Sequence, residues 1–472
     1  MLKAPDSDFL ARLEARLGPG GLRPAEGAWL EEPRGRLHGQ GAAVARPKDR
    51  DAVAAVVEAC AAAGVGIVPY GGGTGLVGGQ VQTEGPAPVI LSLDRMQAIR
   101  LVDPLDNVAI VEAGAVLADV QAAAAEADRL FPLALASEGS CRIGGNLATN
   151  AGGTQVLRYG TARDLCLGVE AVMADGSLFH GLRRLRKDNT GYDLRHLLIG
   201  SEGTLGIITA AALKLFPAPK EQVTALLAVA DPSGALDLLA GLRDRLGEAI
   251  TGFELMHRQG PAFLAETGIA HVRPFGDWPD WLVLLQLDSG AESALQARSM
   301  AALEQAAEAG LISDAVVAQT GQQAADFWAL RESIPAGNRR VGAIASHDIS
   351  VPVSAVPAFI DAAGRAVARI DPTIRINCFG HLGDGNLHYN AFPATGRSRE
   401  DYDACKADVT RAVHDTVDRF GGSFSAEHGV GRLKVGELER YGDPAKLAAM
   451  RAVKAALDPK GILNPGAVLR AE

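Results

Sequence analysis

Two histidines flank a turn signal in the segment 379–390, which reads Phe-Gly-His-Leu-Gly-Asp-Gly-Asn-Leu-His-Tyr-Asn. Asp384-Gly385 is a favoured two-residue turn between antiparallel strands. With that turn His381 pairs directly with His388, and residues paired in this way share one face with their Cβ atoms about 5 Å apart. We therefore expect two converging imidazoles, with Asn390 on the same face of its strand.

Converging imidazoles suit a divalent metal, but two of them need a third ligand to hold an ion firmly. Glu427, in the segment 425–432 (Ser-Ala-Glu-His-Gly-Val-Gly-Arg), is the candidate. Two histidines and one carboxylate with an open position suit catalytic Zn²⁺, or Mn²⁺ or Fe²⁺. Taken alone, the His-x6-His spacing also fits a pair of hydrogen-bonded surface histidines.

His428 follows Glu427 directly and cannot easily ligate the same ion. An imidazole titrates near neutrality and can accept a hydroxyl proton. His428 is therefore a candidate general base, with a supporting histidine as the alternative.

A glycine-rich segment, 69–79 (Pro-Tyr-Gly-Gly-Gly-Thr-Gly-Leu-Val-Gly-Gly), follows a predicted strand. Glycines let a backbone approach a ligand closely and point successive N–H groups at one anion, so a pyrophosphate is the natural guest. Residues 73–78 match Gly-x-Gly-x-x-Gly, but breakers follow them instead of the helix that a dinucleotide fingerprint must open. A P-loop is excluded because no Gly-Lys-Ser/Thr follows, and a plain glycine-rich turn is the remaining alternative.

Two further blocks of small residues strengthen the ligand interpretation. Residues 137–153 and 200–208 combine glycines with short hydroxyl and amide side chains, which can wrap a ligand closely.

The elements that carry these motifs alternate between short strands and helices up to about Pro217, which predicts an α+β domain. Proline continues neither a helix nor an internal strand, so 217–219 (Pro-Ala-Pro) is an expected boundary. A second α+β domain follows, with a strand at 281–286 and helical patterns at 235–246, 291–310, 324–334 and 355–370. A last helix is expected at 444–457.

Composition excludes several classes of protein. The net charge of −10, with no basic stripe beyond short clusters such as 183–186, argues against a nucleic-acid binder. Five scattered cysteines without a Cys-x-x-Cys pair fit a reducing compartment. No apolar run approaches the ~18 residues that span a bilayer, so we expect no transmembrane segment and a cytoplasmic protein.

In order and content, these motifs resemble the flavoprotein family of vanillyl-alcohol oxidase and p-cresol methylhydroxylase, and most closely its D-lactate, glycolate and D-2-hydroxyglutarate dehydrogenase branch. The resemblance runs from about residue 39 to Leu469 and includes the His-Leu-Gly-Asp-Gly-Asn-Leu-His signature. It implies an N-terminal helical segment (1–38), a two-part FAD-binding domain (39–217), a substrate or cap domain (218–415) and a C-terminal segment (416–472) that returns to the flavin domain.

The resemblance assigns the glycine blocks and the terminal Asn-Pro-Gly to FAD. The implied cofactor-binding residues are Pro69, Gly71, Gly72, Gly73, Thr74, Gly75, Leu76, Ser137, Gly139, Ser140, Gly144, Gly145, Asn146, Asn150, Gly152, Gly203, Gly206, Ile207, Ile208 and Asn464. Covalent attachment in the family uses a His or Cys near the flavin, and residues 69–80 contain neither, so we expect non-covalent FAD. Cys141, in the second block, is the one exception nearby.

The implied reaction is oxidation of a D-2-hydroxy acid, with the hydride going to flavin N5 and the proton to His428. His381, His388 and Glu427 match the family's metal ligands, and Arg331 matches an arginine that binds substrate carboxylate. Asn390 is an expected hydrogen-bond donor to the carboxylate. A flavin-binding subunit of a multi-subunit glycolate oxidase and a metal-free alcohol or aldehyde oxidase are the alternatives. The electron acceptor (an electron-transfer flavoprotein, a quinone or oxygen) stays open, as does the oligomeric state, a homodimer included.

The substrate's distal group is the point at which this sequence departs from its relatives. The D-2-hydroxyglutarate enzymes add a threonine four residues after the arginine and a lysine fifteen residues after it, where this chain has Pro335 and Ser346. A buried carboxylate without a cationic partner is strongly disfavoured, which favours D-lactate-like acids. Arg339 or Arg340 could replace the lysine, so D-2-hydroxyglutarate remains equally open.

Overall fold

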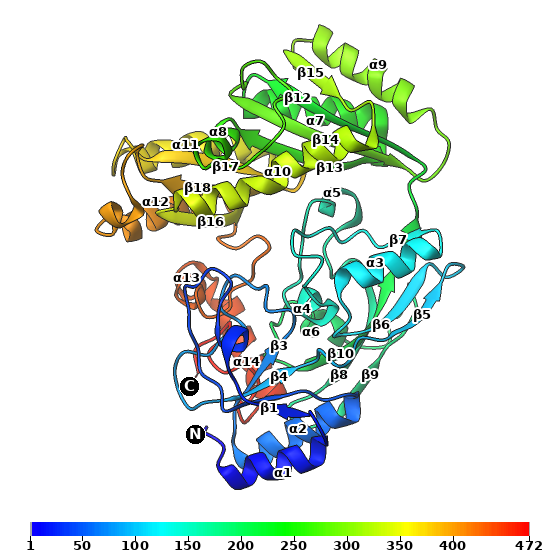
Figure 1. Cartoon of the computed structure of the whole chain (residues 1–472), viewed down its shortest axis with the longest axis vertical. Helices are drawn as coiled ribbons and strands as arrows, with labels where there is room; N and C mark the ends of the chain where they lie inside the picture. Colours follow the sequence, from blue (N-terminus) through cyan, green and yellow to red (C-terminus); the bar gives the residue numbers. More distant parts are fainter. Residues whose placement is uncertain (1, 472) are drawn as a thin grey trace. The chain divides into compact units, whose positions relative to one another are not determined.

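The computed structural model describes residues 2–471, which divide into two compact units (Figure 1). Unit 1 comprises 2–153, 160–218 and 427–471, and unit 2 comprises 154–159 and 219–426. The domain boundaries expected from the sequence lie between residues 217 and 218 and between residues 415 and 416. The second of these falls inside helix α12 (Lys406–Arg419), which packs on strand β16 of unit 2. The N-terminal helix α1 (Ser7–Leu17) packs on α2 (Arg50–Ala63) within unit 1.

Unit 1 is built on two main sheets. The first, in the order β1-β2-β4-β3, pairs β2, β4 and β3 in parallel, and the second, in the order β5-β6-β10-β8-β9, is antiparallel. A two-stranded sheet joins β11 to β7. The strands are β1 Leu22–Arg23, β2 Ala43–Ala45, β3 Ile67–Tyr70, β4 Val89–Ser92, β5 Ile99–Asp103, β6 Val108–Glu112, β7 Arg129–Leu130, β8 Cys166–Val172, β9 Leu178–Gly181, β10 Ile207–Lys214 and β11 Phe216–Pro217.

Besides α1 and α2, unit 1 has helices of 5 to 14 residues, and capping residues are clear at both ends of α2. Asp49 accepts the N–H of Ala52 at the start of α2, and Gly64 ends that helix in the left-handed region at φ 67°. The helices of unit 1 other than α1 and α2 are α3 Leu117–Glu126, α4 Ile143–Ala148, α6 Leu194–Leu198, α13 Val435–Tyr441 and α14 Pro444–Leu457. No helix directly follows the glycine-rich segment 69–79, which agrees with the sequence argument against a dinucleotide fingerprint there.

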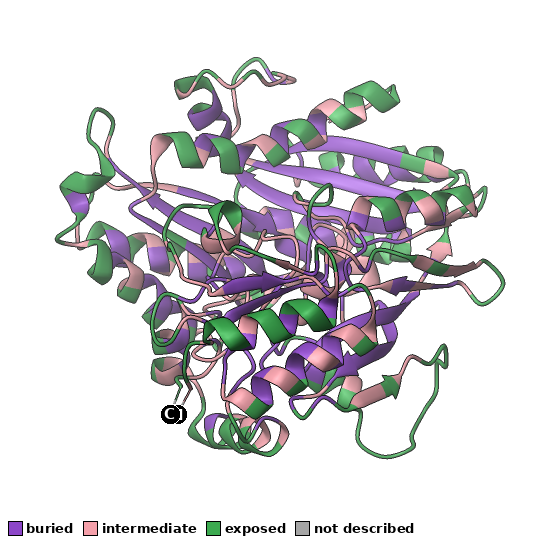
Figure 2. Cartoon of the chain, turned by 60° about the horizontal axis from the view of Figure 1, so that its bottom comes forward, coloured by how far each residue is buried: buried purple, intermediate pink, exposed green. Residues whose placement is uncertain are grey.

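Unit 2 is one antiparallel sheet in the order β15-β12-β14-β13-β17-β18-β16, with helices on both faces. Its strands are β12 Glu221–Val229, β13 Ile250–His257, β14 Trp281–Ser289, β15 Asp314–Val317, β16 Ala345–Ser350, β17 Arg375–His381 and β18 Asn386–Phe392. Its helices are α5 Val156–Tyr159, α7 Pro232–Leu246, α8 Gln259–Glu266, α9 Leu295–Glu308, α10 Gly321–Val341, α11 Val356–Ala368 and α12. Figure 2 shows that its strands are largely buried.

Side-chain alternation divides the core of unit 2 between the two faces of the sheet. On one face Leu227, Leu255 and Leu387 pack with residues of α7, α9, α11 and α12. On the other face Leu226 and Met256 pack with residues of α8 and α10. Helix α10 was expected to end before Pro335, but it continues to Val341. The proline costs one backbone hydrogen bond, which the packing of this helix against α8 and the sheet offsets.

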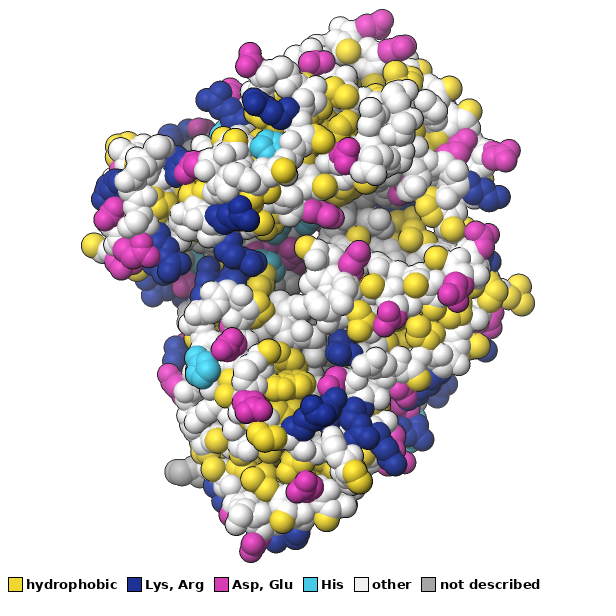
Figure 3. All heavy atoms as spheres, in the orientation of Figure 1, with side chains coloured by type: hydrophobic (Ala, Val, Ile, Leu, Met, Phe, Trp, Pro, Cys, Tyr) yellow, Lys and Arg dark blue, Asp and Glu magenta, His cyan; other side chains and the backbone are white. Residues whose placement is uncertain are grey.

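Three findings concern the surface charge, the cysteines and the possible membrane spans. Figure 3 shows acidic and basic side chains interspersed over the visible face. All five cysteines are free thiols, four of them buried. No helix within residues 2–471 is long and apolar enough to cross a bilayer.

Candidate active site

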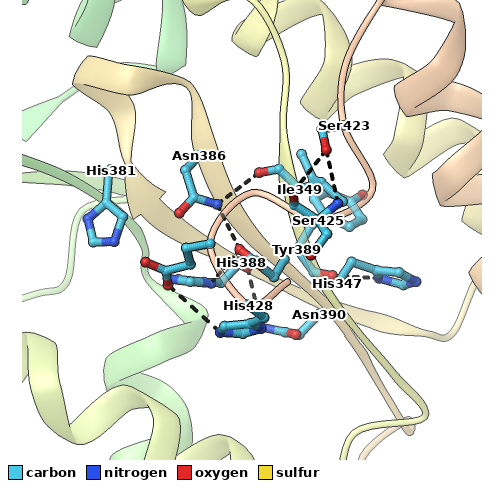
Figure 4. Close-up of polar contacts among 12 residues, drawn as sticks. His347, Ile349, His381, Asn386, His388, Tyr389, Asn390, Ser423, Ser425 and His428 are labelled. Atoms are coloured by element: carbon cyan, nitrogen blue, oxygen red, sulfur yellow. Dashed lines mark hydrogen bonds and ion pairs between the residues drawn. The ribbon is translucent and has the colours of Figure 1, made fainter. Parts of the chain in front are cut away.

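The polar side chains of the predicted site lie on the sheet face that α8 and α10 cover. Register places them in three rows that run across β17, β18 and β16. These rows are His381–Asn386–Ser350, Phe379–His388–Asp348 and Asn377–Asn390–Ser346. Because side chains alternate along a strand, all nine point to one face of the sheet. Figure 4 shows Asn386, His388 and Asn390 along β18.

The hairpin register differs from the one that the sequence predicts. His381 pairs with Asn386, and His388 pairs with Phe379, because residues 382–385 form the loop. A 3₁₀ turn at Leu382–Asp384 precedes Gly385, which adopts φ 79°. The prediction of a two-residue Asp-Gly turn is therefore wrong. The expected convergence survives because the register differs by two residues, which keeps every side chain on its face. The two imidazole centroids lie 5.6 Å apart.

A buried carboxylate behind His381, that of Glu254, was missed by the sequence analysis. Its Oε1 lies 2.6 Å from Nδ1 of His381, and Glu254 is fully buried. A carboxylate on Nδ1 is the arrangement in which Nε2 serves as a metal ligand. The available signal was a single charged residue in an apolar strand, Ile250–His257, because a buried charge requires a partner.

Glu254 also pairs with Arg331. Its Oε2 accepts a hydrogen bond from Nε of Arg331 at 2.8 Å and forms an ion pair with Nη2 at 2.8 Å. The guanidinium stacks 4.7 Å from the centroid of the Phe379 ring. Burial alone would raise the pKa of Glu254, but the charges of His381 and Arg331 and their hydrogen bonds hold that pKa at about 2. Arg331 is thus buried and shares the carboxylate of Glu254 with His381.

His388 has a carboxylate beside it as well. Oδ1 of Asp348 lies 4.0 Å from Nδ1 of His388 and accepts a hydrogen bond from Asn386 at 3.0 Å. Asn386 donates to the carbonyl of Ile349 as well, at 2.9 Å (Figure 4). The side chain of Asn390 donates to the carbonyl of His388 at 3.3 Å.

Chain continuity places Glu427 at the two histidines. The N–H of Ala426 donates to the carbonyl of Asp348, and Glu427 is the next residue. Ligand atoms of His381, His388 and Glu427 all lie within 4.8 Å of one another. This donor set of two imidazoles and one carboxylate fits a divalent ion.

His428 lies beside the same carboxylate, with its Nε2 3.8 Å from Oε1 of Glu427. It forms a second close group with Asp348 and Glu427. His428 therefore lies close enough to Asp348 and Glu427 to share an ion with them, whereas the sequence predicts it as a base apart from the metal ligands.

The residues proposed for the substrate's distal group do not all gather here. Arg339 is exposed on α10, and Nη1 of Arg340 donates to the carbonyl of Thr267 at 2.9 Å. At about 100° per residue Arg340 lies half a turn around the helix from Arg331. Pro335 is exposed on α10, whereas Ser346 is exposed directly opposite Asn390.

The three glycine blocks converge within unit 1, where the FAD residues are expected. A Cβ on Gly72 would collide with the Ser140 carbonyl, a Cβ on Gly203 would collide with Pro69, and a Cβ on Gly71 would meet Gly145 at 3.3 Å. These glycines therefore allow the three blocks to pack closely against one another.

Three asparagine side chains expected to bind FAD, those of Asn146, Asn150 and Asn464, differ in their hydrogen-bond partners. Asn146, on α4, has a buried Oδ1 without a hydrogen-bond partner in the described chain, an atom suited to a bound ligand. Asn150 accepts the N–H of Arg163 at 2.9 Å. Asn464 donates to the carbonyls of Gly79 at 3.0 Å and Glu202 at 2.8 Å. The other expected residues lie in the loops after β3 and around α4, or at the start of β10.

Two family descriptions match the sequence. Residues 218–468 match FAD linked oxidases, C-terminal domain, and residues 41–181 match FAD binding domain. The D-2-hydroxyglutarate dehydrogenase of Xanthomonas citri pv. viticola is 38% identical over 430 residues, covering 90% of this chain and 88% of the relative. The mitochondrial D-2-hydroxyglutarate dehydrogenase of Arabidopsis thaliana is 36% identical over 424 residues, covering 90% and 74%.

Solved structures show the same fold at low identity. A p-cresol methylhydroxylase with substrate bound superposes with a TM-score of 0.74 at 17% identity, covering 99% of each chain. The 4-ethylphenol oxidase from Gulosibacter chungangensis gives 0.74 at 18% identity, covering 100% of this chain and 99% of its own. The expected two-part α+β flavoprotein fold is confirmed.

Proposed function

This chain belongs to the family of FAD-linked oxidases, and we propose that it oxidises a D-2-hydroxy acid to the 2-oxo acid with non-covalent FAD and one divalent metal, zinc by preference. The observation that carries the proposal is the cluster of His381, His388 and Glu427, whose ligand atoms lie within 4.8 Å of one another. The carboxylate of Glu254 on Nδ1 of His381 supports it, because such a contact fixes the tautomer and orientation of a ligating imidazole.

Bound FAD supplies a hydride acceptor, which no side chain can replace. His381, His388 and Glu427 would hold a divalent ion, which would supply Lewis acidity toward the substrate hydroxyl. His428 then accepts the hydroxyl proton, for which its place beside Glu427 is suited.

Arg331 and Asn390 orient the substrate carboxylate. Of the five N–H donors of the guanidinium, that of Nε donates to Glu254, so the group has further donors for a carboxylate. Asn390 contributes an amide from the row next to His388. The electrons pass on to an external acceptor, with an electron-transfer flavoprotein, a quinone and oxygen as the candidates.

The test is a screen of D- and L-2-hydroxy acids with an artificial dye acceptor. Replacing His381 or His388 with Ala is expected to lower kcat by a factor of about 10³ or more, while flavin remains bound because the glycine blocks are elsewhere. Chelator treatment is expected to abolish turnover, and added Zn²⁺ to restore it. Full activity in metal-free protein would refute the metal-dependent mechanism.

A further inference from the structure

The segment that carries Glu427 and His428 is clamped by one buried glutamate, Glu202. Its Oε1 accepts the N–H of Val430 at 2.7 Å, and its Oε2 accepts the N–H of Gly431 at 2.8 Å. Glu202 is only 8% exposed. Both carboxylate oxygens therefore accept hydrogen bonds from backbone N–H groups, two and three residues beyond His428.

Close packing leaves this segment little freedom. A Cβ on Gly429, at φ 81°, would meet Oε1 of Glu202 at 2.7 Å, and a Cβ on Gly431 would collide with the Val77 carbonyl. Arg432 continues the attachment, because its Nη1 donates to the carbonyls of Gly78 at 3.0 Å and Gly79 at 2.9 Å. The segment is thus fastened to the first glycine loop as well as to Glu202.

The backbone of Glu202 is itself held in a conformation that disfavours a side chain. Its φ is 52°, a left-handed value that residues other than glycine adopt rarely and at a cost in free energy. Its N–H donates to the carbonyl of Ala148 and its carbonyl accepts from Asn464, each at 2.8 Å. A glycine would relieve the strain but could not supply the carboxylate, which indicates that the carboxylate is what this position requires.

We propose that Glu202 is a positioning residue of the active site, which holds the segment 427–432 so that Glu427 serves as a metal ligand and His428 as the base. The inference rests on the function proposed above and adds to it a residue from the third glycine block. Glu202 acts through the backbone of Val430 and Gly431 and does not itself touch substrate.

The test compares Glu202→Gln with Glu32→Gln in the FAD-loaded protein. Glu32 is a matched control, since it is 1% exposed and its Oε2 accepts the N–H groups of Arg34 at 2.9 Å and Arg36 at 3.1 Å. A glutamine has only one acceptor oxygen, so at position 202 its NH₂ faces a backbone N–H. We expect Glu202→Gln to raise the dissociation constant for Zn²⁺ by about tenfold or more, with unchanged flavin content.

Two further readouts separate positioning from general stability. In Glu202→Gln the amides of Val430 and Gly431 should lose protection from hydrogen exchange, and the pH profile of kcat/KM should shift because the base is displaced. Glu202→Asp, which keeps a carboxylate, should recover part of the Zn²⁺ affinity. Glu32→Gln should leave all three measurements at wild-type values.

The inference is overturned if Glu202→Gln keeps wild-type Zn²⁺ affinity and exchange, or if both glutamine variants change them equally. If Glu202→Gln does not fold, exchange in the wild-type protein decides: protected Val430 and Gly431 amides support the clamp, and unprotected ones refute it. A wild-type protein that binds no Zn²⁺ would defeat the proposed metal function, while the exchange comparison would still test Glu202.

Discussion

A single carboxylate, that of Glu254, connects two functional groups that the sequence suggested separately. One of its oxygens contacts His381 and the other contacts Arg331, and all three side chains are buried. The proposed metal ligand and the proposed substrate-binding cation therefore contact the same carboxylate. Removing Glu254 would leave the charge of Arg331 buried without its partner, which is costlier than the loss of an exposed ion pair.

We predict that Glu254→Ala lowers the free energy of unfolding by about 3–5 kcal/mol at pH 7. The control is Glu266→Ala, because Glu266 pairs with Arg375 at 2.7 Å but is 42% exposed at its side chain. That variant should lose about 1 kcal/mol or less. Denaturant unfolding of both variants with FAD bound measures the difference, and equal losses would contradict the prediction.

The same contact predicts a pH dependence. The pKa of Glu254 is held at about 2, below its ordinary value of 4.5, by His381 and Arg331 against the opposing effect of burial. The folded state therefore binds fewer protons at this site than the unfolded state, and the contribution of Glu254 to stability is complete above pH 4.5. The gap between wild type and Glu254→Ala should shrink as the pH falls from 4.5 toward 2. A constant gap would exclude this linkage.

At the scale of elements, strand register and helix phase decide which residues meet. Ser346 faces the site because β16 pairs it with Asn390. Arg340 is turned away because it lies nine residues, half a helical turn out of phase, beyond Arg331 on α10. Arg339 is closer in phase to Arg331, about 80° away around the helix.

Helix phase therefore predicts which arginine serves a second carboxylate. If the chain accepts D-2-hydroxyglutarate, Arg339→Ala should lower kcat/KM for that substrate by an amount that corresponds to about 2 kcal/mol or more of transition-state stabilisation. The kcat/KM for D-lactate should stay nearly unchanged. Arg340→Ala is the matched control, with little effect on either substrate. Equal losses on both substrates with Arg339→Ala, or no loss on either, would show that Arg339 does not compensate for Ser346.

At the scale of the whole molecule, segments far apart in the sequence build unit 1. The residues expected to bind FAD come from the loop after β3, from the region around α4, from the start of β10 and from Asn464 near the end of the chain. Among the free cysteines, Cys141 lies in the second glycine block and is 2% exposed. Burial raises the pKa of its thiol, so the thiolate needed for attachment to flavin is scarce.

Acid precipitation is accordingly expected to release all the flavin into the supernatant. The absorbance of supernatant and pellet at the flavin maximum measures this. Yellow colour that stays in the pellet would mean a covalent link, and Cys141→Ser would then identify or exclude that cysteine as its site.

The sequence by itself determined the fold class, the approximate positions of several helices and the identity of the converging histidines, because these depend on local periodicity and on the alternation of side chains along a strand. It missed the loop of the hairpin and the continuation of α10 through Pro335, because in both places packing outweighs local preference. Only the tertiary structure brought Glu254 to His381 and Arg331, and Glu202 to Val430 and Gly431. These partners lie 77 to 229 residues apart, a separation at which no local pattern specifies contact.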